Sequence, residues 1–414
     1  MRGRSVMSPI SYEPKSAVVR DLVDFICRSN SRFVEFNTAV ENARKPENGG
    51  QREMDQEKIY TLEDYIKFVD HFVRWAPKVS SAGDEVLNKI LVFYWVLDQP
   101  VLKQYQTAIT PETADTDLKW LSYWLVTFAR EQGRWLDSEE SAGSVYSFYR
   151  NSKYNKEADQ WEEPENGWKS FNHWFGREWK DIDVSRPVAQ PNDDNVIVHV
   201  ADSKFDGHWD INDGRIHLKT SVNMKGVDWP VETLLRDSGI DYKNGSFMHG
   251  FLAPTDYHRQ HAPVSGEVIE ARNIRDQVYL QVARKAGGGI DRSRGLVRHW
   301  VDPEHRRTQD QGQFYDIEAP DEAGFQWCQT RGVITIQTQN YGKVAVLPIG
   351  MAQVSSVKLT VNVGDQVKKG DNISYFQFGG SDVCIVFEKR VKWRADLQPG
   401  KTKLKVREKL ATFH

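Results

Sequence analysis

The period of the hydrophobic positions changes along the chain. In the first part, apolar residues recur every three or four positions, which is the period of an amphipathic helix. One such helix is predicted to begin at a capping box formed by Thr61 and Asp64, and to end before Pro77. Two further segments share this period, at 84–97 and 116–136. The aromatic residues of the second of these are expected to pack in a helical core.

From about Asn195 onward, short segments alternate apolar and polar residues and are separated by Gly, Asp and Asn, as in β-strands. A polar stretch with Pro and Gly near residue 160 separates the two patterns. Helices followed by strands are typical of an α+β fold. We therefore predict an all-α N-terminal domain over 1–165 and a mainly antiparallel β barrel or sandwich over 166–414.

Composition narrows the classes of partner. The 414 residues carry 55 Lys and Arg against 58 Asp and Glu, so the net charge of -3 gives no general attraction to nucleic acid. No apolar run approaches the roughly 18 residues that a membrane-spanning helix needs, and the start of the chain lacks the apolar core of a secretory signal. The three cysteines are far apart. A cytoplasmic protein without a metal centre is expected.

An unusual triplet, Gly379-Gly380-Ser381, interrupts an apolar strand-like run. Glycine weakens a strand interior unless the backbone bends there or another group approaches closely. A serine hydroxyl beside such an unhindered peptide can attack the preceding carbonyl and form an ester, whose elimination and hydrolysis would leave a pyruvoyl group. The same triplet is also common in ordinary turns, so the segment alone leaves both interpretations open.

Two other segments carry candidate chemistry. His258 and His261 are separated by two residues in a loop punctuated by Pro and Gly, but no convincing third metal ligand lies near them in the sequence. Asp202 follows an apolar strand, where a carboxylate either closes a turn or orients a histidine for base catalysis.

Taken in order, the motifs of the second half resemble those of the phosphatidylserine decarboxylase family. The matching segments are FNHWFGREWKDIDVSRPV, VADSK, MKGVDWPVETLLRD, YHRQHAPVSG, PIGMAQVSSV and VKKGDNISYFQFGGSDVCIVF. Members of that family make their own pyruvoyl cofactor. The resemblance implies that this chain is a carboxy-lyase made as a proenzyme.

The resemblance also implies roles for residues of the processing region. Ser381 would be the nucleophile of self-cleavage and the precursor of the pyruvoyl group. Gly380, preceded by Gly379, would become the C-terminus of a large chain, and residues 381–414 would form a small chain. One departure is Asp382, where the family usually has Thr or Ser; its carboxylate could speed proton removal, or it could repel a substrate carboxylate.

By the same resemblance, His261 would be the base that activates Ser381, and Asp202 would orient His261. His258 would transfer protons during decarboxylation. For Asp202 and His258 the alternatives are a turn former and a packing residue.

The expected substrate is a free aromatic amino acid such as L-tryptophan, decarboxylated through a Schiff base, because the helical extension is similar to that of soluble relatives with this activity. Phosphatidylserine is the alternative, and only in that case could the chain associate with a membrane, through the aromatic segment at 116–128 if its aromatic face were exposed. A third possibility is a non-catalytic binding protein. Its basis is that PVSGEV and VGDQVKKGD resemble the paired turns of a biotinyl- or lipoyl-type barrel.

Overall fold

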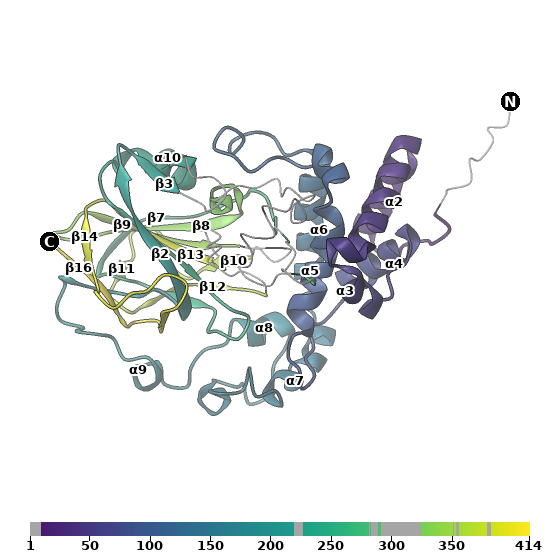
Figure 1. Ribbon diagram of the computed structural model, residues 1–414. Helices are drawn as coiled ribbons and strands as arrows, with labels where there is room; N and C mark the ends of the chain where they lie inside the picture. Colours follow the sequence, from purple (N-terminus) through teal and green to yellow (C-terminus); the bar gives the residue numbers. More distant parts are fainter. Residues whose placement is uncertain are drawn as a thin grey trace.

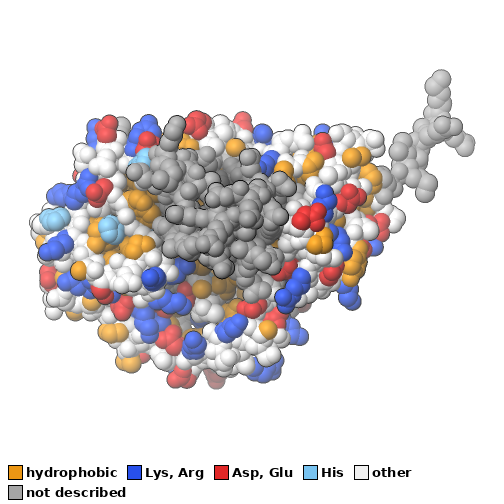
Figure 2. Space-filling view, viewed as in Figure 1, with side chains coloured by type: hydrophobic (Ala, Val, Ile, Leu, Met, Phe, Trp, Pro, Cys, Tyr) orange, Lys and Arg blue, Asp and Glu red, His pale blue; other side chains and the backbone are white. Residues whose placement is uncertain are grey.

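The computed structural model consists of a helical part at one end and a β-sheet part at the other (Figure 1). It describes residues 10–218, 227–280, 282, 289–290, 324–350, 352, 356–378 and 382–414. Gly379, Gly380 and Ser381 lie outside the described residues. On the face shown in Figure 2, acidic and basic side chains are interspersed, in keeping with the small net charge.

The first part of the chain is helical, as predicted. Its α-helices are α1 (Ala17–Cys27), α2 (Asn30–Arg44), α3 (Gln51–Gln56), α4 (Leu62–Val73), α5 (Glu85–Leu97), α6 (Trp120–Leu136) and α7 (Tyr146–Tyr149). The predicted capping box is present at the start of α4, where the Thr61 side chain accepts a hydrogen bond from the backbone N–H of Asp64. Shorter 3-10 turns are η1 (Pro46–Asn48), η2 (Pro100–Tyr105), η3 (Glu139–Ser144), η4 (Ala158–Gln160), η5 (Arg236–Asp241) and η6 (Phe325–Cys328).

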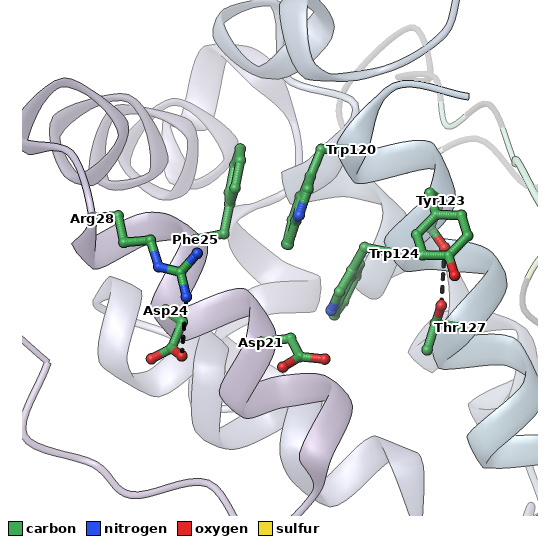
Figure 3. A pocket seen from close by; sticks show the side chains of 8 residues that line it. All are labelled: Asp21, Asp24, Phe25, Arg28, Trp120, Tyr123, Trp124 and Thr127. Carbon is green, nitrogen blue, oxygen red and sulfur yellow. Dashed lines mark hydrogen bonds and ion pairs between the residues drawn. The ribbon is translucent and has the colours of Figure 1, made fainter. Parts of the chain in front are cut away.

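Aromatic side chains join α1 to α6 (Figure 3). The ring of Phe25 stacks on that of Trp120, with centroids 3.7 Å apart and planes 5° apart. The indole N–H of Trp124 donates to the carbonyl of Val18 at 2.7 Å. Trp124 and Phe128 are buried, so the aromatic segment at 116–136 packs into the helical core, as expected.

The second part is mainly antiparallel β structure. A large sheet has the order β11-β7-β8-β9-β13-β5-β2-β3-β4, with β15 paired to β2. Two three-stranded sheets, β1-β16-β14 and β10-β12-β6, complete it. The strands are β1 (Val196–Val198), β2 (Ser203–Asn212), β3 (Arg215–Leu218), β4 (Val227–Pro230), β5 (Ser246–Phe251), β6 (Arg259–His261), β7 (Gly266–Ile274), β8 (Arg331–Gln337), β9 (Lys343–Ile349), β10 (Val357–Leu359), β11 (Gln366–Val367), β12 (Asn372–Phe376), β13 (Asp382–Phe387), β14 (Val391–Trp393), β15 (Lys403–Leu404) and β16 (Lys409–Phe413).

The named strand pairs are antiparallel, which confirms the predicted class. Along the described strands the large sheet runs from β11 to β4 without these ends pairing, so it is open rather than a closed barrel. β13 lies between β5 and β9, and all six of its residues are buried. The chain therefore enters the middle of the sheet at Asp382, the second residue after the predicted cleavage between Gly380 and Ser381.

A short helix, α8 (Phe171–Phe175), lies between the two parts, α9 (Ile182–Ser185) belongs to a loop below the sheets, and α10 (Val231–Leu235) follows β4 (Figure 1). Phe171 and Phe175 pack edge-on against Phe378, with ring centroids 5.2 and 5.4 Å away. The side-chain oxygen of Asn172 accepts a hydrogen bond from the backbone N–H of Phe378 at 3.0 Å. One hydrophobic core extends without a break from the helices into the sheets.

Candidate active site

The two histidines of the YHRQH segment are brought to β12 by strand pairing. His261 ends β6 and lies opposite Asn372 in the ladder, while the backbone N–H of Phe376 donates to the carbonyl of His258 at 2.9 Å. Both side chains are buried. Because β12 ends at Phe376, the connection that contains Ser381 begins beside His258.

The ring of His261 has a defined tautomer. Its Nδ1 lies 2.7 Å from the carbonyl oxygen of Gly370, which can only accept, so Nδ1 carries the hydrogen. Its Nε2 then accepts from the hydroxyl of Tyr257 at 3.2 Å. Burial lowers the pKa of His261 to about 3, against the opposing effect of the Gly370 hydrogen bond. The imidazole is therefore neutral near pH 7, the state that a general base requires.

His258 has an aromatic environment. Its ring lies 4.0 Å from that of Phe175 on α8, centroid to centroid, and Phe376 approaches it edge-on at 6.4 Å. Phe175 also contacts Phe378. The helix of the FNHWFGREW motif thus packs directly against this histidine.

Asp202 is bound by an arginine that sequence reasoning did not connect with it. Its carboxylate accepts from Arg186 Nε at 3.1 Å and Nη2 at 2.6 Å, and from the backbone N–H of Val406 at 2.8 Å. Arg186 also binds Glu157, at 2.8 Å.

The expected hydrogen bond between Asp202 and His261 is therefore not found between these two described residues. Instead, the carbonyl of Gly370 orients the imidazole. The two segments still adjoin, because the backbone N–H of His261 donates to the carbonyl of Val200 at 2.8 Å. A catalytic role for Asp202 stays a prediction, and any such role would act through Arg186.

A buried acid–base cluster that the sequence analysis missed surrounds Asp382. His249 on β5 lies between two carboxylates, with Nδ1 3.0 Å from Asp206 Oδ2 and Nε2 3.2 Å from Asp382 Oδ2. Gln326 Nε2 donates to the same Asp382 oxygen at 2.9 Å. Each of these four residues is at most 2% exposed.

The cluster holds a charged imidazole. Burial alone lowers the pKa of His249, but the charge and hydrogen bond of Asp382, together with those of Asp206, outweigh it and raise the pKa to about 9. His249 is thus an imidazolium near pH 7 and offsets the charge of Asp382. In the sequence, only Asp382 could have indicated this cluster, because it departs from the family pattern. His249 gave no such indication, because it lies within an apolar strand.

We expect replacement of His249 by Gln to destabilise the protein most at low pH. The folded pKa of about 9 lies above the usual 6.5, so the stabilisation is fully present below pH 6.5 and is lost as the pH rises through 9. Breaking a buried ion pair costs about 3–5 kcal/mol. Urea unfolding at pH 6 and pH 10 measures the difference, with His217→Gln as control, since the His217 side chain is 41% exposed. An equal loss of stability at both pH values would show that His249 is not charged in the folded state.

Within the described ranges, no His, Cys, Asp and Glu side chains group so that they could hold a metal ion. Over the same residues, no helix has the length and apolar character needed to cross a bilayer.

Comparison with known proteins places this geometry in a family. The model of the family "Phosphatidylserine decarboxylase" matches residues 171–412, more than half of the chain. Phosphatidylserine decarboxylase proenzyme 2 of Oryza sativa is 30% identical over 71% of this chain and 41% of its own length. The proenzyme of Fusobacterium nucleatum is 28% identical over 66% of this chain and 74% of its own length.

L-tryptophan decarboxylase of Psilocybe cyanescens is 27% identical over 55% of this chain and 48% of its own length. The chain thus spans less than half the length of the rice and Psilocybe proteins. The family match covers α8, the two histidines of YHRQH and the strands on both sides of Ser381. This confirms the resemblance seen in the motifs, and the chain belongs to the phosphatidylserine decarboxylase family.

Proposed function

We propose that this chain is a self-processing decarboxylase that removes the α-carboxylate of an amino acid group as CO2. Members of the family are pyruvoyl-dependent carboxy-lyases made as proenzymes, and their pyruvoyl group derives from a serine on cleavage. The observation that carries the proposal is the pairing of β6 with β12. It places a neutral His261 and a buried His258 beside the strand that leads to Ser381.

The described surroundings fit a small, uncharged keto group. Phe378 and Asp382, on either side of the undescribed triplet, are both buried, and Phe175 adds an apolar wall. The negative charge of Asp382 is offset by His249. A pyruvoyl group derived from Ser381, which lies between Phe378 and Asp382 in the chain, would supply an electron sink for the release of CO2 from an amine substrate.

The chain's own groups then have distinct tasks. His261 Nε2 takes the hydroxyl proton of Ser381 during maturation, once Tyr257 releases its hydrogen bond. His258 moves a proton to or from the substrate during decarboxylation. The aromatic wall around His258 keeps water away from both steps.

Two substrates remain candidates. Phosphatidylserine is supported by the higher identity to the rice proenzyme, over a larger part of this chain. L-tryptophan, the substrate expected from the helical extension, is supported by the 27% identity to the Psilocybe enzyme. Of the aromatic residues of α6, Trp124 and Phe128 are buried and Tyr123 is exposed, so this helix offers no exposed aromatic stripe for docking on lipid.

The third possibility, a binding protein without chemistry, has one structural observation in its favour. The segments PVSGEV and VGDQVKKGD do lie side by side, because β11 pairs with the start of β7, with Gln366 opposite Glu267. Such paired turns are compatible with either function. Only the processing of the chain separates them.

Intact mass under denaturing conditions tests the proposal, together with product assays on L-tryptophan and on phosphatidylserine vesicles. We expect two chains, the larger ending at Gly380 and the smaller beginning at position 381 with a pyruvoyl terminus. We also expect CO2 release from one of the two substrates. A single uncut chain of 47.7 kDa without CO2 release from either would contradict the proposal and favour the binding protein. Activity confined to the vesicles would exclude the free amino acid.

A further inference from the structure

The first residue of β13 carries a charge into the middle of the large sheet. Asp382 is 1% exposed, and its strand is paired to β5 on one side and to β9 on the other. Its carboxylate lies 3.2 Å from His249 Nε2 and accepts from Gln326 Nε2 at 2.9 Å. Removing a carboxylate from water is costly unless such partners compensate for the loss. A charge at this place, directly after Ser381 in the chain, therefore calls for a functional reason.

The two faces of β13 have different surroundings. Val383 packs in the hydrophobic core that also contains Phe378, whereas Cys384 packs in the smaller core that contains Phe247 of β5. Because the side chains of a strand alternate between its faces, Asp382 shares the face of Cys384. Its carboxylate therefore points away from the core that contains Phe378. This placement suits a group that holds the strand better than a group that reacts.

A charged cluster on one face of a strand can fix its register. If β13 slipped by one residue along β5, every one of its side chains would change face. Asp382 would then enter the larger core, away from His249, and Val383 would lie among the charges. In the observed register Asp382 is opposite Phe251 on β5 and Ile349 on β9. Selecting one register is the best-attested use of a buried polar group that finds its partners in a single arrangement.

The charges that face His249 come from neighbouring strands. Asp206 on β2 lies 3.0 Å from its Nδ1, and Asp382 on β13 lies on the side of Nε2. Burial and the charge of Asp382 raise the pKa of the Cys384 thiol, so this group is neutral, and burial lowers the pKa of Arg331 on β8 to about 10. In the described part of the chain, the ionisable groups that act on the cluster or on Arg331 are Asp206, Asp382, Cys384, Cys328, Asp276 and Arg236.

We infer that His249 and Asp206 are positioning residues for self-cleavage, which hold Asp382 in one register of β13 and so fix the start of the small chain. The inference rests on the proposed function, because it concerns the maturation of the same chain. The carboxylate of Asp382 is then an anchor, a role that differs from the two that the sequence allowed. No bond to Asp382 is made or broken in this role.

The rate of self-cleavage after cell-free synthesis of the full chain tests the inference. Intact mass gives the rate, and circular dichroism gives the folded fraction, so that the rate is expressed per folded molecule. At pH 7, His249→Gln should be cut at least about tenfold more slowly, because two buried carboxylates remain without the cation between them and the strand start is misplaced. Asp382→Asn should be cut within about threefold of the wild type, because an amide oxygen still accepts from His249, which keeps Asp206.

The double variant His249→Gln/Asp382→Asn separates an anchor from a reacting group. It should be cut faster than His249→Gln alone, because the unpaired carboxylate is gone. Raising the pH from 7 to 10 should slow the wild type about tenfold, because His249 loses its charge through a pKa of about 9, and should slow the double variant less. Arg331 is present in both, so their difference isolates His249. The matched control is His217→Gln, which changes a partly exposed histidine outside the cluster and should be cut like the wild type.

Cleavage of folded His249→Gln at the wild-type rate would overturn the inference, and so would a double variant that is cut no faster than His249→Gln. If His249→Gln does not fold, the pH comparison decides, and an equal fall in rate in the wild type and the double variant would overturn the inference. Loss of cleavage in Asp382→Asn would make its carboxylate a reacting group instead of an anchor. A wild-type chain that stays uncut would contradict the proposed function and the inference with it, whereas a cut wild type with equal rates in every variant would contradict the inference alone.

Discussion

Replacing Ser381 with Ala is expected to leave one uncut chain of 47.7 kDa that folds but releases no CO2 from either candidate substrate. The change deletes the hydroxyl that attacks the preceding carbonyl, so neither the ester nor the pyruvoyl group can form. Loss of one hydroxyl has little effect on the core beside it, where β13 is held by β5 and β9. Intact mass gives the processing, and circular dichroism gives the fold.

Ser31→Ala, at an exposed position on α2, is the matched control and should be cut like the wild type. His261→Ala should resemble Ser381→Ala, because it removes the only proposed base. Cleavage at the normal rate in Ser381→Ala would show that another residue is the nucleophile. Normal cleavage in His261→Ala would move the role of base elsewhere, with Asp382 the next acid–base group to test.

Replacing His258 with Ala is expected to give a chain that is still cut yet decarboxylates at least about 100-fold more slowly, the usual range for loss of a general acid–base group. The two steps separate because His258 contacts Phe175 and Phe376, whereas the proposed base of maturation is His261. Intact mass and the initial rate of CO2 release measure the two steps independently.

The control for this variant is His217→Ala, which removes a partly exposed histidine of β3 that pairs with Asp228. It should be cut and active. If His258→Ala retained full activity, His258 would be a packing residue, the alternative that its sequence context also allowed. If it were not cut at all, maturation and decarboxylation would share this histidine.

The fold class could be predicted because local patterns decide it. The capping box at Thr61 and the stripe of apolar residues behind it describe a helix without reference to the rest of the molecule. The alternating segments after Asn195 do the same for strands. The open ends of the large sheet could not be predicted, because which strands pair is decided by contacts between residues far apart in the sequence.

The candidate site was predictable only where its residues share a motif. His258 and His261 were found together because β6 contains one and follows the other. The link from Arg186 to Asp202 was missed although both residues lie in recognised motifs, since nothing local shows where an arginine side chain reaches. His249 was missed because a histidine inside the apolar strand β5 has the same local pattern as a core position. Asp206 was missed because nothing local shows that β2 pairs with β5 and brings it to His249.

Because β13 lies in the middle of the large sheet, the proposed enzyme must fold before it is cleaved. Residues 382–387 are hydrogen-bonded to β5 on one side and β9 on the other, and β15 and β16 bind β2 and β1. A small chain starting at residue 381 would thus leave the large chain only by breaking sheets at several places. The uncut chain is the unit that must fold, and cleavage can only follow. Once separated by denaturant, the two pieces would have lost the covalent link that brought them into register.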